Sequence, residues 1–406
     1  MKTPWLISLA AALVIAPVAL HAADKLVITA TNDLSIARPS ETITVPWTEV
    51  NKALPHARVG HLLVKDAAGQ SLAYQVTNLA AEAKDPKYEG VAYGVLLFQH
   101  DFTAGEKSAT FTVEKIAALA PVFPTKAFAR FVPERLDDFA WENDRIAHRT
   151  YGPALGAPDV EKRGKEVLVT SGLDIWSKRV RYPIVDRWYN VGHDHYHVDE
   201  DEGMDMYNVG TSRGCGGTGV WDSQNLYVGR NYKTWKVLAN GPIRAIFELG
   251  YEAWDFNGAK VSELKRFTVD AGTNLDLIES TFTVEGGPKE ITIGIGLNKN
   301  SSDKGQDSKS EVAKNDKANW LSQWEIQKTN GSLGEAIIVP TAFAGFAEDS
   351  VNQLVLAKAV SGQPVRYYVG AGWTKSGDFS SQDDWNSYVA AWAARVQSPV
   401  KIIVGQ

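Results

Sequence analysis

Strict alternation of apolar and polar residues, interrupted at short intervals by Gly, Pro and Asp, constrains the fold of this chain more than any other feature. It starts with "KLVITATND" at Lys25 and continues to about Glu114. After the proline-containing stretch 116–138, longer segments of the same kind resume and run to the closing "PVKIIVGQ". Period-two patterning between turn residues predicts short antiparallel strands. We therefore expect an all-β protein, with a small N-terminal β-sandwich over residues 24–120 and a large antiparallel supersandwich over residues 121–406.

Two segments depart from this rhythm. The late stretch "SQDDWNSYVAAWAARVQS" predicts one helix, with Ser381 or Asp383 as its N-cap and aromatic residues along one face. The polar run from Asn298 to Asn319 has almost no apolar residues and predicts a surface loop, or a lid if it borders a site.

The N-terminus indicates the compartment. Lys2 precedes an apolar run that ends in small residues near Ala23, which is typical of a cleaved signal peptide over residues 1–23. The apolar run is too short to span a membrane, so we expect a periplasmic or secreted protein with no membrane span. A net charge of −6 argues against a nucleic-acid partner, and the single Cys215 excludes an internal disulfide.

The glycines between Gly214 and Gly219 satisfy the G-x-G-x-x-G spacing of dinucleotide-binding loops. Their context does not, because no apolar strand precedes them and no helix follows. The two readings that remain are a loop that lets backbone approach a ligand and a plain turn.

The densest polar stretch is "GHDHYHVDEDEGMD", Gly192–Asp205. His193 and His197 have the i, i+4 spacing of a helical zinc motif, but the surrounding residues support a helix poorly. In an extended conformation, alternate residues from His193 to Asp199 fall on one side. His195, His197 and Asp199 are then candidate ligands for a divalent cation, zinc or calcium, and the alternative is that these histidines are solvated or hydrogen-bonded near a loop.

The same stretch also fits proton-transfer chemistry on an acidic sugar. Elimination at a uronic acid needs a group that neutralises the carboxylate, a base for the C5 proton and an acid for the leaving O4. Tyr196, His197 and Tyr207 supply imidazole and phenol groups, and Arg145 or Arg213 supplies a cation. We expect His197 to act as the base and Tyr196 or Tyr207 as the acid, with the carboxylate met by arginine or by the metal.

Four motifs carry a resemblance to a known family: "DDFAWENDRIAHRTYGPAL", "DIWSKRVRYPIVDRWY", "YHVDEDEGMDMYNVGTSRGCGG" and "YYVGAGWTKSGDF". Together they resemble an uncharacterised-domain family of exported bacterial proteins associated with the degradation of pectin and other uronic-acid glycans. The resemblance implies a galactose-mutarotase-like supersandwich, as in the chondroitin and hyaluronan lyase group, but no catalytic roles. It also implies one shared polar pocket, whose members are Trp141, Glu142, Asn143, Arg145, Lys178, Arg179, Tyr196, His197, Asp199, Asp205, Tyr207 and Arg213.

The function we expect is therefore a polysaccharide lyase acting on an acidic oligosaccharide or polysaccharide. Three alternatives stay open: a glycoside hydrolase using paired carboxylates, a mutarotase-like epimerase, and a non-catalytic sugar-binding protein whose Trp and Tyr rings stack on sugars.

Overall fold

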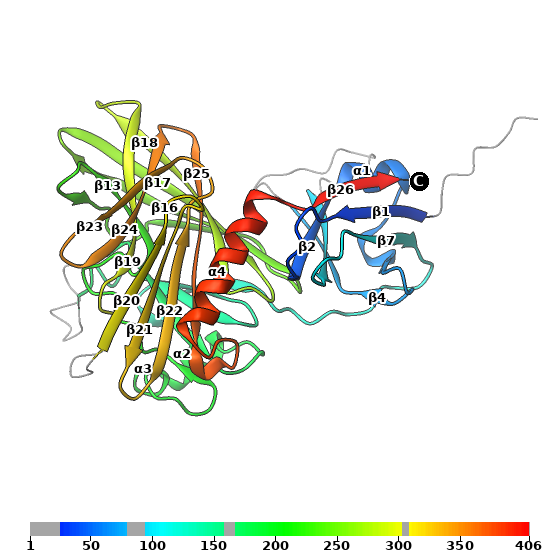
Figure 1. Ribbon diagram of the computed structural model, residues 1–406, viewed down its shortest axis with the longest axis horizontal. Helices are drawn as coiled ribbons and strands as arrows, with labels where there is room; N and C mark the ends of the chain where they lie inside the picture. Colours follow the sequence, from blue (N-terminus) through cyan, green and yellow to red (C-terminus); the bar gives the residue numbers. More distant parts are fainter. Residues whose placement is uncertain (1–24, 79–93, 158–166, 303–307, 406) are drawn as a thin grey trace, which may run out of the picture.

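The computed structural model describes residues 25–78, 94–157, 167–302 and 308–405. About 52% of the chain is strand and 12% is helix, and the sheets are antiparallel and sandwich-like, which confirms the expected β-rich fold class. Figure 1 shows a large body built from long strands and a smaller body that carries β1 and β26. No helix in the described ranges is long and apolar enough to cross a membrane.

In the part that the structure describes, the small body has two sheets, the α-helix α1 (Trp47–Ala53) and a short 3-10 helix (Val59–His61). Its apolar side chains, among them Leu26, Phe98 and Phe111, form a core of their own. The first sheet contains, in spatial order, β26 (Lys401–Gly405), β1 (Lys25–Thr31), β7 (Ser108–Lys115), β3 (Leu62–Lys65) and β4 (Ser71–Leu72). The second contains β2 (Arg38–Pro46), β6 (Val95–Phe102) and β5 (Tyr74–Thr77).

The end of the chain returns to the small body. Strand β26 pairs antiparallel with β1, with Val27 opposite Gly405 and Thr31 opposite Lys401. The small body is therefore closed by residues from both ends of the sequence, whereas the sequence pattern assigned the whole of 121–406 to the second domain. Nothing in the local pattern of "KIIVG" indicates which sheet edge it will join.

The large body contains three sheets around the main core. The longest sheet has eight strands, β15 (Thr234–Ala239), β16 (Arg244–Phe256), β17 (Ala259–Asp270), β18 (Leu275–Glu285), β25 (Pro364–Trp373), β22 (Gly331–Ile338), β21 (Trp320–Gln327) and β20 (Ser308–Asn315). A second sheet has β14 (Leu226–Tyr227), β13 (Cys215–Trp221), β19 (Glu290–Asn298), β24 (Asn352–Val360) and β23 (Phe343–Glu348). A third has β12 (Gly203–Met204), β11 (Leu173–Lys178), β10 (Ile146–Thr150), β9 (Asp138–Glu142) and β8 (Phe128–Val132).

The predicted late helix is confirmed as α4 (Gln382–Gln397). Ser381 is its N-cap, since its hydroxyl accepts a hydrogen bond from the backbone N–H of Asp384. Trp385 and Val389 bury one side of the helix against the eight-stranded sheet. Figure 1 shows α4 running from the large body toward the small one.

Two loop predictions are wrong. The glycine-rich segment is the buried strand β13, and Gly216 is needed there because its φ is +100° and a Cβ would lie 2.7 Å from the side chain of Val369. Residues 308–315 of the predicted loop or lid form β20 at the edge of the long sheet, where every residue is at least partly exposed, and residues 303–307 lie outside the described residues. A mostly polar edge strand has too few apolar residues to show a period of two.

Candidate active site

A buried arginine organises the region between β10, β11 and the segment that follows them. The Nε of Arg149 donates to Asp174 Oδ2 at 2.6 Å and its Nη2 donates to Asp205 Oδ2 at 2.8 Å. Its Nη1 donates to the Tyr196 hydroxyl at 3.1 Å. Burial opposes the charge, but Asp205 and Asp174 raise the pKa of Arg149 well above its ordinary value, so it is a permanent cation.

Aromatic rings enclose this cation. Its guanidinium carbon lies 5.3 Å from the ring centroid of Trp176 and 5.5 Å from that of Tyr196. The two rings pack on each other with centroids 4.8 Å apart. Tyr196 is thus fixed both at its hydroxyl and across its face.

A second group of hydrogen-bonded polar side chains, around Asp138, lies beside the Arg149 group. Tyr189 donates its hydroxyl hydrogen to Asp138 Oδ2 at 3.2 Å, and Arg135 Nη1 lies 3.2 Å from Asp138 Oδ1. Burial raises the pKa of Asp138 although Arg135 and Arg149 lower it. The phenol and carboxyl groups therefore meet behind the surface rather than in solvent.

In front of these groups is a hollow of about 480 Å³. It is lined by Glu134, Arg135, Leu136, Leu155, Tyr189, Gly192, His193 and Tyr196. A depression of about 360 Å³ lies on the other side of Tyr196 and includes His195 and Glu200. The larger hollow, which we call the His193 hollow, is the candidate active site because it joins accessible imidazole and buried phenol in one space.

A one-turn helix places the histidines. Helix α2 (Val185–Val191) ends at Gly192, whose φ is +109°, and α3 (His193–Tyr196) follows at once. The prediction that this stretch is extended is therefore wrong, because the positive φ at glycine lets the chain restart a helix. The helical turn brings the rings of His193 and His197 to 4.7 Å and those of His193 and Tyr196 to 5.4 Å.

The environments of His193 and Tyr196 suit proton transfer. Burial and the neighbouring His197 lower the pKa of His193, so its imidazole is neutral at neutral pH. Burial raises the pKa of Tyr196 even though Arg149 lowers it, so the phenol keeps its proton. A neutral base and a protonated acid that lie side by side are the arrangement that acid–base catalysis needs.

His197, the base predicted from the sequence, lies beside the hollow and not among its lining residues. Its Nδ1 is 2.8 Å from the backbone oxygen of Asp205, so Nδ1 donates and Nε2 carries the lone pair. This bond fixes the ring against His193. His197 is thus better placed to position His193 than to reach a ligand in the hollow.

The predicted metal ligands do not converge. His195 is exposed and its Nδ1 faces Glu200 Oε1 at 3.6 Å, while Asp199 Oδ2 lies 3.1 Å from Arg179. Because α3 is helical, His195 points away from the side that His193 and His197 share. Within the described ranges, no three His, Cys, Asp or Glu side chains are grouped so as to hold a metal ion.

A second set of predicted residues is structural. Lys178 Nζ donates to Glu142 Oε2 at 2.6 Å and to the Asn143 backbone oxygen at 2.7 Å, and Glu142 also accepts from the backbone N–H groups of Ile184 and Val185. The space between Lys178 and Arg145 is only about 10 Å³, room for about one water. The Lys178–Glu142 pair thus holds the N-terminus of α2 in place through the backbone N–H groups that Glu142 binds.

Asn143 and Arg145, which lie next to this pair, also have their polar groups hydrogen-bonded within the protein. The side-chain amide of Asn143 donates to the backbone oxygens of Asp270 and Thr273, at 2.6 and 2.8 Å. Arg145 Nη1 donates to Asp378 Oδ1 at 2.6 Å. The expectation that Arg145 and Lys178 share a pocket with Tyr196 is wrong, since neither lines the His193 hollow and each is paired with a carboxylate elsewhere.

A third set is enclosed in the main core. Trp141 Nε1 donates to Asp276 Oδ2 at 2.8 Å, and Tyr207 donates to Glu335 Oε2 at 3.3 Å. Arg213 is 3% exposed and its Nη1 donates to Ser171 Oγ at 2.8 Å. Burial lowers the pKa of Arg213 to about 10. These three side chains are buried and none of them lines the His193 hollow.

Of the predicted site residues, Tyr196 lines the His193 hollow, and Asp205 and His197 support it from behind. The sequence reasoning missed Arg149, Arg135, Tyr189 and Asp138, and passed over His193 as a catalytic residue. One signal could have revealed Arg149, namely a permanent cation within "IAHRT", a strand in which every position is buried.

Together these features define a β-sandwich protein with an accessible polar hollow at the edge of its third sheet. The chain belongs to the family described as domain of unknown function (DUF4861), whose model matches residues 30–402. It is 30% identical to uncharacterized protein P7 of Formosa agariphila over 406 residues, which covers 98% of each chain. Membership of an uncharacterised-domain family is therefore confirmed.

Solved structures show weaker likeness. An α-mannosidase from Enterococcus faecalis V583 matches with a TM-score of 0.42 and 9% identity over 94% of this chain. A protein in glycosyl hydrolase family 38 from Enterococcus faecalis matches with a TM-score of 0.46 and 9% identity, also over 94% of this chain. The chain spans 46% and 48% of those two chains, and similarity at this level says nothing about its chemistry.

Proposed function

We propose that this protein is a carbohydrate-active enzyme that cleaves a uronic-acid-containing glycan by β-elimination in the His193 hollow. The observation that carries the proposal is the neutral imidazole of His193, exposed at the hollow, beside the protonated phenol of Tyr196. The acidic sugar is supported by Arg135, a cation in the lining, and agrees with the family resemblance of the sequence motifs.

The roles follow from the contacts. Arg135 meets the sugar carboxylate and makes the C5 hydrogen more acidic. His193 takes the C5 proton, and the electron pair of the C5–H bond forms the C4=C5 double bond. The C4–O4 bond breaks, and the leaving oxygen takes the proton of Tyr196.

Arg149 completes this scheme from behind. The Tyr196 oxygen accepts a hydrogen bond from Arg149, which leaves its own hydrogen available to a leaving group. The phenolate that remains after proton transfer faces a permanent cation, which stabilises it. His193 then returns a proton to the phenolate through solvent, and the site is restored.

Hydrolysis by a carboxylate pair has less support in this hollow. Among the described residues that line it, Glu134 is the only carboxylate, and its Oε1 is 2.5 Å from Arg130 Nη2. A retaining or inverting hydrolase needs two carboxyl groups across the cleft. The proposed elimination needs no carboxylate pair.

The apolar segment at the start of the chain, outside the described residues, supports a site of action beyond the cytoplasm.

The test is incubation of the purified protein with pectin, alginate and glycosaminoglycan fragments while the ultraviolet absorbance of the new double bond is followed. We expect a rise with at least one uronate glycan. His193→Ala lowers the rate by about 10²- to 10⁴-fold, and Tyr196→Phe, which keeps the ring against Trp176, has a similar effect. His195→Ala, on the other side of α3, is the matched control and keeps the rate.

Flat absorbance over the whole panel sinks the lyase proposal. New reducing ends without absorbance indicate hydrolysis. Saturable binding without any product indicates a non-catalytic sugar-binding protein.

A further inference from the structure

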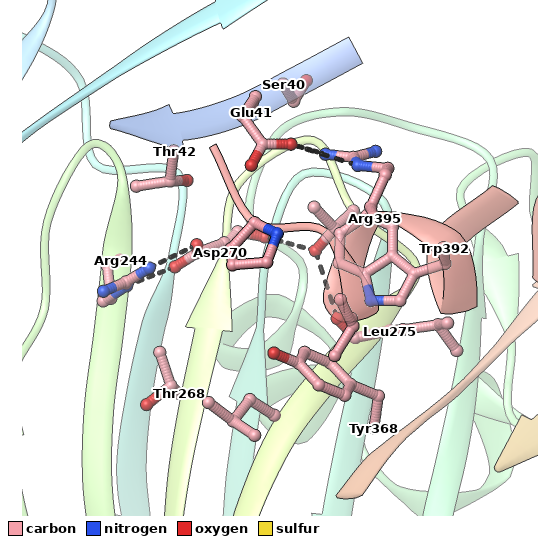
Figure 2. Close-up of a pocket in the computed structure, with 14 residues that line it drawn as sticks. Ser40, Glu41, Thr42, Arg244, Thr268, Asp270, Leu275, Tyr368, Trp392 and Arg395 are labelled. Atoms are coloured by element: carbon pink, nitrogen blue, oxygen red, sulfur yellow. Dashed lines mark hydrogen bonds and ion pairs between the residues drawn. The ribbon is translucent and has the colours of Figure 1, made fainter. Parts of the chain in front are cut away.

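A separate cavity of about 200 Å³ lies where the two bodies and α4 meet. Figure 2 shows its walls: β2 of the small body on one side, α4 on another, and the outer face of the eight-stranded sheet below. Junctions between structural units are places where small-molecule sites recur. None of its lining residues belongs to the His193 hollow, so the inference drawn from it is independent of the proposed function.

Two arginine–carboxylate pairs form the polar side of the cavity. Arg244 donates from Nε and Nη2 to the two oxygens of Asp270, at 2.5 and 2.6 Å. Arg395 of α4 donates from Nη2 to Glu41 Oε2 of β2 at 2.8 Å. The lining side chains themselves carry two cations and two anions, and behind them Arg38 Nη1 lies 3.3 Å from Glu41 Oε1.

These pairs still have hydrogen-bonding capacity. A carboxylate accepts at about four lone-pair positions and a guanidinium carries five N–H groups, so each pair can bind further hydroxyls at its edge. Ser40, Thr42 and Thr268 add hydroxyl groups to the same lining. The polar side therefore offers donors and acceptors close together, which suits a ligand with several hydroxyl groups.

The rest of the lining is apolar and aromatic, and it meets the polar side at Trp392, whose ring centroid lies 4.3 Å from the guanidinium carbon of Arg395. Tyr368 of β25 and Trp392 of α4 meet edge to face, with ring centroids 6.2 Å apart, above Leu275 and Leu277. The Trp392 indole N–H is buried and has no hydrogen-bond partner within the described ranges. A buried donor of this kind is costly unless a ligand or water accepts from it.

Contacts around the cavity fix its walls. Gly272 approaches Ser40 so closely that a Cβ would lie 2.2 Å from the serine hydroxyl oxygen. The backbone N–H of Asn274 donates to the Tyr388 hydroxyl of α4 at 2.9 Å. The cavity thus lies inside a framework held from the small body, the sheet and the helix.

We propose that this cavity is a binding site for one neutral hexopyranose ring. Such a ring has apolar C–H faces and hydroxyl groups around its rim. The faces match the Tyr368 ring and the two leucines, and the hydroxyls match the arginine–carboxylate pairs and the serine and threonine hydroxyls of the lining. The volume is below the roughly 300–1,000 Å³ of pockets for drug-sized ligands, so it accommodates a single ring. The enzyme then holds a neutral sugar at a place distinct from the acidic sugar in the His193 hollow.

Isothermal titration calorimetry of the full chain with glucose, galactose, mannose and glucuronate tests the proposal. We expect saturable binding of at least one neutral hexose and about tenfold weaker binding of glucuronate. Thr268→Phe fills the cavity and abolishes binding, whereas Thr281→Phe, on the same outer sheet face but outside the lining, leaves it unchanged. Tyr368→Ala removes the ring and weakens binding about tenfold.

Circular dichroism and thermal melts of each variant show whether the fold is kept. His193→Ala separates the two proposals, because it slows elimination by about 10²- to 10⁴-fold and leaves hexose binding intact. The proposal is overturned if no neutral hexose binds saturably, or if Thr268→Phe binds as well as Thr281→Phe does.

Discussion

The His193 hollow and the interior beneath β9 and β11 are built from the same kinds of side chain but use them in different ways. At the hollow, the buried pairs of Arg149 hold Tyr196 against a space that a ligand can enter. In the interior, Lys178 and Glu142 satisfy each other and the first N–H groups of α2, with side chains only 1% exposed. A buried charged side chain in this β-sandwich therefore indicates a functional site only where its hydrogen-bond network reaches a space that a ligand can enter.

The contrast is sharpest between two adjacent residues. Lys178 ends β11 inside the protein, whereas Arg179 points outward to Asp199 and Asp201, with 36% of its side chain exposed. The sequence makes both equally good candidates for binding an acidic sugar. The fold assigns one to the interior and the other to the surface.

The largest effect is expected at Lys178. Lys178→Met leaves the Glu142 carboxylate buried without its cation, which lowers the free energy of unfolding by about 3–5 kcal/mol. Burial already raises the pKa of Glu142 and lowers that of Lys178, so neither charge is tolerated alone. Chemical denaturation at neutral pH measures the loss.

The double variant Glu142→Gln with Lys178→Met is the control for this pair. It removes both charges, and we expect it to recover part of the lost stability because no uncompensated ion remains. A single Lys178→Met variant as stable as the wild type would mean that this interior pair behaves like a surface pair.

An intermediate effect is expected from the buried pair Asp276 and His148. Asp276 Oδ2 lies 3.7 Å from His148 Nε2. Burial raises the pKa of Asp276 to about 7, so its contribution to stability is complete below its ordinary value of 3.8 and is lost as the pH rises through 7. Burial lowers the pKa of His148 to about 4, so its contribution is present above 6.5 and is lost as the pH falls through 4. The two trends oppose each other over most of this range.

Asp276→Asn removes the pH dependence of stability that comes from Asp276 and leaves the one that comes from His148. We expect the stability of the variant relative to wild type to increase by roughly 4 kcal/mol between pH 4 and pH 8. Denaturation series at several pH values measure it, with the exposed Asp255→Asn as control. Parallel curves for wild type and Asp276→Asn would show that the buried carboxyl does not titrate in this range.

The elements that the sequence predicted well are those set by local pattern. The alternation in "KLVITAT" and "AKVSELKRFTVD" produces β1 and β17, and Ser381 caps α4 as expected. The predictions that failed concern strands whose structure depends on contacts with segments far away in the sequence. Strand β13 has no period of two because each of its glycines makes room for another segment, and β26 is locally an ordinary strand that could have paired elsewhere.

The site was predicted only in part for the same reason. Tyr196 was found because it lies in a dense polar stretch, whereas Arg149 is separated from Asp174 and Asp205 by 25 and 56 residues along the chain. Tyr207 carries the same phenol group as Tyr196 but faces the core. Burial is a property of the assembled sheets, so residue type alone cannot separate these cases.

The smallest effect is expected at Arg179, and it completes the comparison with Lys178. Arg179→Ala removes two ion pairs at the surface, where solvent screens the charges, so the free energy of unfolding falls by no more than about 1 kcal/mol. Moderate salt removes most of that difference in Arg179→Ala and none of the difference in Lys178→Met, because the interior pair is shielded from ions. Denaturation of both variants with and without added salt measures this. A salt-independent loss of several kcal/mol in Arg179→Ala would mean that the surface around Asp199 is as enclosed as the interior, and the distinction between the two regions would fail.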